Sequence, residues 1–203
     1  MSEKYNTLEY YNKNAQLYYD QTLVGNLQEN YDKFLKEIPL NAYILDFGCG
    51  SGRDSKYFIE KGYKVKPIDG SIEMCKLASQ YINQEVECMK FEELNDVNTY
   101  DGIWACSSIL HMEKEKLPDI LNKMIEALRD GGVIYTSFKV GTGYEIKEGK
   151  YYNYITKNEM EDILKNLNRN VKIINYFETF PSTKRNAVGT IWGNYIIKKE
   201  KQI

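Results

Sequence analysis

A carboxylate and three glycines lie close together at the end of an apolar run, in Ile44-Leu45-Asp46-Phe47-Gly48-Cys49-Gly50-Ser51-Gly52-Arg53-Asp54. A glycine turn after a buried strand lets the backbone come close to a ligand, because glycine has no Cβ. A dinucleotide fingerprint needs a small residue where Arg53 stands, so this turn does not predict a dinucleotide site. We expect Asp46 instead to present its carboxylate to the cleft, where an amino group is the natural partner.

A second carboxylate, Asp69, ends the next apolar run in Pro67-Ile68-Asp69-Gly70-Ser71. An acidic residue about 20 positions after such a turn is placed to hold the two hydroxyl groups of a ribose. Asp69 could also simply cap the helix that follows it. Together Asp46 and Asp69 indicate a ligand that carries both a ribose and an ammonium group, and S-adenosylmethionine is such a ligand.

The chain has a single histidine, His111, which follows a later apolar run in Ser107-Ser108-Ile109-Leu110-His111-Met112. An imidazole that titrates near neutrality can orient a substrate or take a proton from its nucleophile. The alternative is a structural histidine at the start of a helix. The sequence alone leaves both roles open.

Short apolar runs alternate with helical stripes along the chain, which is typical of an α/β protein with a mostly parallel sheet and crossover helices. Residues 1–40 have helical spacing, and Pro39 closes that segment. Strands are expected at 43–47, 65–68, 86–89, 102–106 and 133–138, with helices at 53–61, 72–82 and 116–128. Gly131 stands where the left-handed C-cap of the last helix belongs.

The pattern changes after the fifth expected strand. Residues 139–153 contain three glycines and predict a loop whose length indicates a function. The segment Ile155-Thr156-Lys157-Asn158-Glu159-Met160 is a capping box with a hydrophobic staple, and it predicts a helix as far as about Leu167. Two final apolar runs, at 171–180 and 191–197, have no helix between them and should pair antiparallel.

Composition narrows the class of protein. The 203 residues carry 27 lysines and arginines against 29 acidic residues, so the net charge of −2 gives no broad field for a nucleic-acid partner. The cysteines at 49, 75, 88 and 106 form no close ligand pair, so no metal is expected. No apolar run approaches the roughly 20 residues of a membrane helix. We therefore expect a single-domain, cytoplasmic protein without export, a monomer or a homodimer, that acts on a small molecule.

Four motifs occur in order along the chain: ILDFGCGSGRDS (44–55), IDGS (68–71), TYDGIWACSSILHM (99–112) and LRDGGVIYTSF (128–138). They resemble the class I S-adenosylmethionine-dependent methyltransferases, and the GCGSGRDS turn is similar to small bacterial members near the tellurite-resistance methyltransferases. The resemblance implies a Rossmann-like, doubly wound, seven-stranded sheet in three αβα layers, mostly parallel with an antiparallel terminal strand. It divides the single domain 1–203 into a helical lid (1–40), a cofactor-binding core (41–139), and a substrate-side loop, helix and terminal β-hairpin (140–203).

The resemblance also implies which residues bind S-adenosylmethionine. The family commonly has an acidic residue for adenine where this chain has Lys90, so adenine recognition should depend on backbone groups and packing near Met89, Phe91 and Ile72. Arg53 would hold the cofactor carboxylate, or would instead pair with Asp54 or Glu60 at the surface. The expected cofactor-binding residues are Tyr11, Tyr18, Asp46, Gly48, Cys49, Gly50, Gly52, Arg53, Asp69, Gly70, Ser71, Phe91 and Cys106.

Four residues are expected to bind the methyl acceptor. His111 would overlook the transferable methyl group in the resembling family, and Tyr151 and Tyr152 follow the long glycine loop. Arg185, beside Lys184, could hold an anionic group, although a solvated loop would explain both residues.

The predicted function is methyl transfer from S-adenosylmethionine to a small-molecule acceptor. Two alternatives stay open: methylation of RNA or protein, and binding of S-adenosylmethionine without catalysis. Base methylation is disfavoured, because Ala105-Cys106-Ser107-Ser108 lacks the Asn-Pro-Pro-Tyr type of segment that shapes a pocket for a flipped base.

Overall fold

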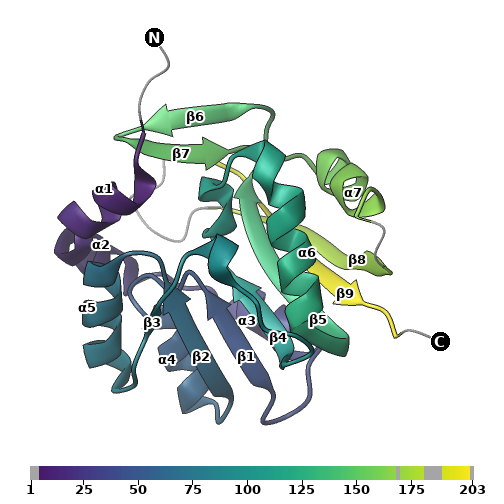
Figure 1. The fold of residues 1–203 in the computed structure, drawn as a ribbon, viewed down its shortest axis with the longest axis horizontal. Coiled ribbons are helices and arrows are strands. Elements are labelled where there is room, and N and C mark those ends of the chain that lie inside the picture. The colour runs from purple at the N-terminus through teal and green to yellow at the C-terminus, as the bar shows by residue number, and fades with distance from the viewer. Residues whose placement is uncertain (1–4, 168–169, 181–188, 202–203) are drawn as a thin grey trace.

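The computed structural model describes residues 5–167, 170–180 and 189–201 (Figure 1). Seven strands form one sheet in the order β3-β2-β1-β4-β5-β9-β8, and β6 and β7 form a separate hairpin. The sheet strands are β1 (Tyr43–Phe47), β2 (Lys64–Asp69), β3 (Glu87–Cys88), β4 (Tyr100–Ala105), β5 (Leu128–Lys139), β8 (Val171–Thr179) and β9 (Trp192–Lys199). The helices are α1 (Thr7–Lys13), α2 (Ala15–Thr22), α3 (Gln28–Leu35), α4 (Arg53–Glu60), α5 (Ile72–Ile82), α6 (Leu117–Ala127) and α7 (Lys157–Lys165), with short 3-10 turns η1 (Phe91–Glu93), η2 (Ile109–His111) and η3 (Lys114–Lys116).

The sheet has the predicted Rossmann-like arrangement. The first five strands in the spatial order are parallel, whereas β9 runs antiparallel to both of its neighbours, β5 and β8. Alternate side chains of each strand enter opposite layers: Ile103 packs with α6 and α7, whereas Trp104 packs with α3 and α4. Figure 1 accordingly shows helices on both faces of the sheet. The predicted fold class is confirmed.

Two local predictions were wrong. The segment expected to be a loop contains a hairpin, β6 (Tyr144–Lys147) and β7 (Lys150–Asn153), because Glu148 and Gly149 both take positive φ and form a two-residue turn. Gly131 does have a positive φ of 82°, but α6 already ends at Ala127, so Gly131 lies in the irregular start of β5 rather than in a helix cap. The capping box of Thr156 and Glu159 is confirmed at the start of α7.

The first helix is tied to the β6–β7 hairpin. The Asn6 amide donates to the Gly149 carbonyl at 3.0 Å, and the Tyr151 amide donates to Thr7 Oγ1 at 3.2 Å. Lys150, only 2% exposed, lies over the Tyr10 ring at 3.7 Å. Helix α1 and the hairpin therefore meet above the carboxyl edge of the sheet, as Figure 1 shows at the upper left.

Candidate active site

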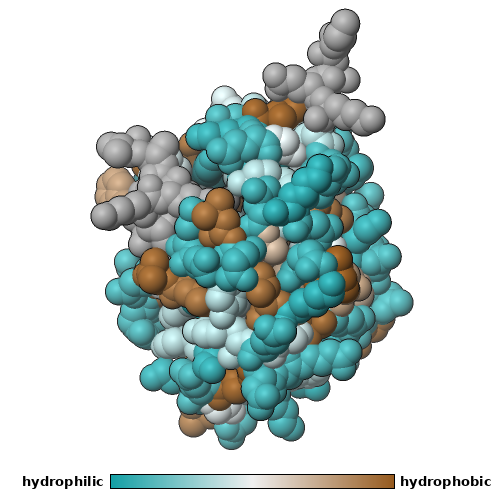
Figure 2. All heavy atoms as spheres, turned by 90° about the vertical axis from the view of Figure 1, so that its left-hand side faces the viewer, coloured by the Kyte–Doolittle hydropathy of each residue, from teal (hydrophilic) through white to brown (hydrophobic). Residues whose placement is uncertain are grey.

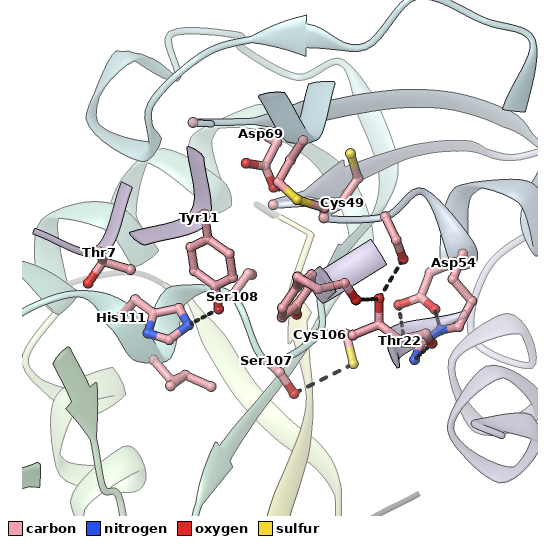
Figure 3. Close-up of a pocket in the computed structure, with 18 of the residues that line it drawn as sticks. Thr7, Tyr11, Thr22, Cys49, Asp54, Asp69, Cys106, Ser107, Ser108 and His111 are labelled. Atoms are coloured by element: carbon pink, nitrogen blue, oxygen red, sulfur yellow. Dashed lines mark hydrogen bonds and ion pairs between the residues drawn. The ribbon is translucent and has the colours of Figure 1, made fainter. Parts of the chain in front are cut away.

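A cleft of about 450 Å³ lies at the carboxyl ends of β1, β2 and β4, under α1 and α2. Its walls include the glycine turn after β1, the end of β2 and the segment after β4. Figure 3 shows Asp69, Tyr11, His111 and Cys106 around this space. The cleft thus brings together residues from all four of the sequence motifs.

The glycine turn is shaped for close approach. Gly48 has φ of 86°, and a Cβ there would lie 2.6 Å from Ser108 Cβ and 3.1 Å from the Phe91 ring. Gly50 has φ of 55°, and a Cβ there would lie 3.4 Å from the Tyr18 ring. Both positions therefore favour glycine for their backbone conformation, and Gly48 also needs it for space. Below them Ser108 Oγ is buried without a hydrogen-bond partner in the described part of the chain.

Asp69 closes one side of this turn. Its Oδ2 accepts the Gly50 amide at 2.9 Å and its Oδ1 accepts the Ser71 amide at 2.8 Å. Burial raises the pKa of Asp69, and the two backbone hydrogen bonds work against that rise. Each carboxylate oxygen has accepted one backbone hydrogen bond, so each keeps capacity for a second donor on the cleft side.

Arg53 and Asp54 form a partly buried ion pair at another wall of the cleft. Arg53 donates to Asp54 from Nε at 2.6 Å and from Nη2 at 3.1 Å, and its Nη1 donates to the Thr22 carbonyl at 3.2 Å. Asp54 also accepts from Tyr31 at 2.6 Å and from the Trp104 indole at 2.8 Å. Burial opposes ionisation of Asp54, but the Arg53 charge and these hydrogen bonds outweigh it and lower the pKa of Asp54.

His111 is held in one tautomer by two partners. Its Nδ1 lies 2.7 Å from the Tyr151 carbonyl oxygen, which can only accept, so Nδ1 carries the proton. In the neutral ring Nε2 is then the acceptor, and the Tyr11 hydroxyl, 2.9 Å away, donates to it (Figure 3). Tyr11 and His111 both line the cleft, and the Tyr11 hydroxyl proton is directed at the imidazole.

The segment after β4 is strained where it borders the cleft. Ser107 is not a glycine and yet has φ of 53°, and its amide donates to Ser137 Oγ at 2.9 Å. Such a conformation costs about 1–3 kcal/mol and is found often at functional sites. Beside it, burial and the Asp54 charge raise the pKa of the Cys106 thiol to about 12. Cys106 is therefore a neutral thiol at physiological pH.

This pKa predicts slow alkylation of Cys106. At pH 8 iodoacetamide should label the exposed Cys88 at least about 100-fold faster than Cys106, because the thiolate is the reactive species. Peptide mapping by mass spectrometry after timed labelling measures both rates, and a Cys88→Ser variant separates the two signals. Equal labelling of the two cysteines would contradict the structure.

Most of the predicted cofactor residues line the cleft: Tyr11, Tyr18, Gly48, Cys49, Gly50, Arg53, Asp69, Gly70, Phe91 and Cys106. Of the predicted substrate residues, His111 and Tyr152 do so. Arg53 pairs with Asp54 as one alternative predicted, although this pair is partly buried and not at the surface. Arg53 also borders the cleft, and its contact with the cofactor carboxylate stays a prediction.

Three expected cofactor residues lie outside the cleft, and their side-chain roles are corrected. Asp46 is only 2% exposed and accepts the Ser55 hydroxyl at 2.6 Å beneath the turn, so it presents no carboxylate to the cleft. Burial and the neighbouring Asp54 raise its pKa well above the usual range. Gly52 faces α5, where a Cβ would lie 3.0 Å from Ile82. Ser71 caps α5 and donates to Asn12 at 2.7 Å.

Two expected substrate residues are also placed differently. The Tyr151 ring packs against Tyr5 and Tyr144, and only its backbone carbonyl reaches the site, through His111. Arg185 lies outside the described residues. For adenine packing, Phe91 borders the cleft as expected, whereas Met74 takes the place predicted for Ile72 and Met89.

The sequence interpretation missed a group of polar cleft residues. Asn30, Tyr135 and Asn194 come from α3, β5 and β9 and line the cleft together. Thr22, Asp54, Ser107 and Ser108 border it as well. Among these residues, only Ser107 and Ser108 could have been predicted from the sequence as cleft residues, because they follow β4 directly and precede His111.

Two further properties bear on the chemistry of the described residues. Within the ranges 5–167, 170–180 and 189–201, no group of three or more His, Cys, Asp and Glu side chains could hold a metal ion. Among the helices in those ranges, none is long and apolar enough to cross a membrane.

Comparisons with known proteins agree with this site. Residues 44–132 match the family model described as a methyltransferase domain. An "Uncharacterized methyltransferase" of Staphylococcus carnosus is 28% identical over 146 residues, which are 66% of this chain and 70% of that protein. The malonyl-acyl-carrier protein O-methyltransferase of Salmonella typhimurium is 29% identical over 114 residues, which are 53% of this chain and 43% of that protein.

A solved structure of similar fold is that of Burkholderia thailandensis 1,6-didemethyltoxoflavin-N1-methyltransferase, bound to 1,6-didemethyltoxoflavin and S-adenosylhomocysteine. The match has a TM-score of 0.75 and 18% identity, and covers 96% of this chain and 85% of that one. At this identity the likeness shows the fold, and it agrees with the seven-stranded sheet described above.

Proposed function

We propose that this protein transfers the methyl group of S-adenosylmethionine to a small organic molecule, and the match of residues 44–132 to a methyltransferase-domain model supports this proposal. The observation that carries the proposal is the hydrogen bond from the Gly50 amide to Asp69, which joins this carboxylate to the glycine turn beside the cleft. The size of that cleft fits a cofactor and a small acceptor together. The match covers only 43% of the Salmonella relative, so the acceptor named for that enzyme is not carried over.

The residues around the glycine turn fit S-adenosylmethionine. Asp69 has carboxylate oxygens left for the ribose hydroxyls, and Gly48 and Gly50 leave room for the chain of the amino acid part. Arg53 keeps guanidinium hydrogens beyond those that it gives to Asp54 and Thr22. These hydrogens would reach the cofactor carboxylate.

The adenine end would lie between apolar walls. Met74 and Phe91 border the cleft near Asp69, and Phe91 packs on Phe47 with ring centroids 4.6 Å apart. Lys90 and Glu92 both line this region. Glu92 offers the carboxylate that Lys90 cannot provide, and it would accept the adenine amino group.

The chemistry at the other end of the cleft concerns a proton. When bound, S-adenosylmethionine supplies a methyl group that passes to the acceptor atom and leaves the cofactor sulfur uncharged. An acceptor O–H, N–H or S–H next to Tyr11 would give its proton to the Tyr11 oxygen while the Tyr11 proton moves to His111 Nε2. The resulting imidazolium keeps its Nδ1 hydrogen bond to the Tyr151 carbonyl.

The proposed proton transfer from the acceptor through Tyr11 to His111, which we call the proton relay, predicts a large effect of replacing His111. A His111→Ala variant should lose about 100-fold or more in kcat, which is the usual share of a general base, with little change in cofactor affinity. Tyr11→Phe should lose activity as well, because the phenol no longer connects acceptor and imidazole.

Unchanged kcat in a folded His111→Ala protein would remove the base from the mechanism. Methyl transfer would then proceed by proximity and alignment alone.

The proposed function is tested by binding and turnover. Calorimetry should show binding of S-adenosylhomocysteine, and conversion of S-adenosylmethionine should be stimulated by one class among thiols, amines, carboxylates, phenols and chalcogen oxyanions. Chalcogen oxyanions are included because the sequence resembles the tellurite-resistance methyltransferases, and that resemblance stays a prediction. No binding would refute the proposal. Tight binding without turnover would favour a non-catalytic protein, and strongly salt-dependent RNA binding would favour an RNA methyltransferase.

A further inference from the structure

Part of the cleft wall serves neither the cofactor nor the proton relay. It consists of Asn30 from α3, Tyr135 from β5 and Asn194 from β9, which are 4%, 0% and 1% exposed. These three side chains hydrogen-bond to one another. We refer to them as the amide–phenol cluster.

The orientation of Asn194 follows from its partners. Its Nδ2 lies 3.1 Å from the carbonyl oxygens of both Phe177 and Trp192, and carbonyls only accept. The nitrogen must therefore face these carbonyls, which turns Asn194 Oδ1 toward Tyr135 and Asn30. The Tyr135 hydroxyl donates to this oxygen at 2.7 Å.

The orientation of Asn30 follows in turn. Because Asn194 Oδ1 is an acceptor, Asn30 must present its Nδ2, which lies 2.9 Å from that oxygen and 2.8 Å from the Tyr135 hydroxyl. The two hydrogens of Asn30 Nδ2 and the hydroxyl hydrogen of Tyr135 are thereby used inside the cluster. The cluster has no hydrogen left to offer a ligand.

What remains is one acceptor atom. Asn30 Oδ1 has no hydrogen-bond partner in the described part of the chain, and it is not among the side-chain atoms sealed in the interior without one. Asn30 lines the cleft, so the cleft is the space to which this oxygen is open. A ligand that meets the cluster must supply the hydrogen.

The neighbouring charges are already paired. Arg53 lines the same cleft, but Asp54 holds it through two hydrogen bonds, and the pair adds no net charge. An anionic group against Asn30 Oδ1 would therefore lose its water without gaining a donor from the cluster.

On the proposed function, we infer that the methyl acceptor is an uncharged molecule that places an N–H or O–H donor on Asn30 Oδ1, at a point away from the atom that receives the methyl group. Asn30 is a specificity-determining residue for this donor. Lactams, primary amides and N–H heteroaromatic rings are the matching chemical classes, and carboxylates are excluded from this position.

The test uses two pairs of probes that differ only in the relevant group: nicotinamide with nicotinate, and benzimidazole with 1-methylbenzimidazole. Their dissociation constants are measured by ligand-observed NMR on the protein saturated with S-adenosylhomocysteine. The first member of each pair should bind at least about 10-fold more tightly, because the second lacks the donor. In Asn30→Leu this preference should shrink to less than about twofold while S-adenosylhomocysteine affinity is kept.

Equal or tighter binding of nicotinate and 1-methylbenzimidazole, or no binding of any probe, would overturn the inference. So would a preference that survives in Asn30→Leu. If that variant fails to fold, Tyr135→Phe with the same probes replaces it, since loss of the phenol frees a hydrogen of Asn30 and lets the amide turn. Failure of S-adenosylhomocysteine binding by the wild type would instead refute the proposed function, so the two failures are distinguishable.

Discussion

Replacing Asp69 with alanine should weaken S-adenosylhomocysteine binding by about 100-fold or more. The carboxylate would give two hydrogen bonds to the ribose, each worth about 1.5–3 kcal/mol for a charged partner, and 1.4 kcal/mol is a factor of ten. The variant also leaves the Gly50 and Ser71 amides without the acceptor that fixes the turn. Asp69→Asn keeps one acceptor oxygen and should lose about 10-fold. Calorimetry gives both constants.

Asp130→Ala is the matched control for that experiment. Asp130 lies in the irregular start of β5, at the opposite end of the strand from the cleft, and it forms an ion pair with Lys199 at 3.8 Å. Its removal should leave the affinity unchanged. Wild-type affinity in a folded Asp69→Ala protein would exclude Asp69 from the cofactor site.

The second large effect concerns stability and Asp54. An Asp54→Ala variant should lose about 3–5 kcal/mol of unfolding free energy, because Arg53 would remain partly buried without its counter-charge. Tyr31 and Trp104 would lose their acceptor in the same step. Urea denaturation followed by circular dichroism measures the change.

A double variant tests whether the loss comes from the orphaned charge. Arg53→Met with Asp54→Leu removes both charges and should recover much of the stability, although it should weaken cofactor binding. A loss below about 1 kcal/mol in Asp54→Ala would mean that the pair is solvated rather than buried.

The same pair predicts how stability depends on acid. The pKa of Asp54 is lowered in the folded protein, so its contribution is present above the unfolded value of about 3.9 and is lost as the pH falls through the folded value. Asp46 has the opposite effect, because its pKa is raised in the folded protein. Protonated Asp46 favours the folded state at low pH, and ionisation of Asp46 at higher pH destabilises that state. Asp54→Asn should therefore flatten the acid limb of the stability curve.

Rules that use only the residues near one another in the sequence could predict that some side chains lie at the cleft. Asp69 could be found because the end of a strand in an α/β sheet is recognisable from a short apolar run, and its position after the glycine turn is characteristic. Asp46 could not be placed by the same rule. It lies within β1, where successive side chains alternate between faces, and its side chain reaches Ser55 in the layer below the turn.

Other parts of the site depend on contacts between residues that are far apart in the sequence. Asn194 reaches the cleft because β9 inserts between β5 and β8, which pairs Asn194 with Ser137 and brings it within 2.9 Å of Asn30. No local pattern encodes that meeting of three segments. The β6–β7 hairpin, in contrast, had a signal in its two-residue Glu148-Gly149 turn, which the glycine-rich composition of the surrounding segment obscured.

The surface over α1, α2 and α5 is mixed in hydropathy. On the side of the molecule that carries α1, α2 and α5, Figure 2 shows hydrophobic side chains in small groups separated by hydrophilic ones. Such scattered groups are normal for a protein surface.

The attachment of α1 to the hairpin has a consequence for the timing of turnover. Leu8 of α1 covers Gly70 so closely that a Cβ there would lie 2.8 Å from its side chain, and Tyr11 of the same helix contacts His111. The same helix thus contacts both the proposed ribose end and the proposed proton relay. With the cofactor bound as proposed, release of the spent cofactor would require α1 to lift, and this motion would also break the contact between Tyr11 and His111, so product release and loss of the relay would be coupled.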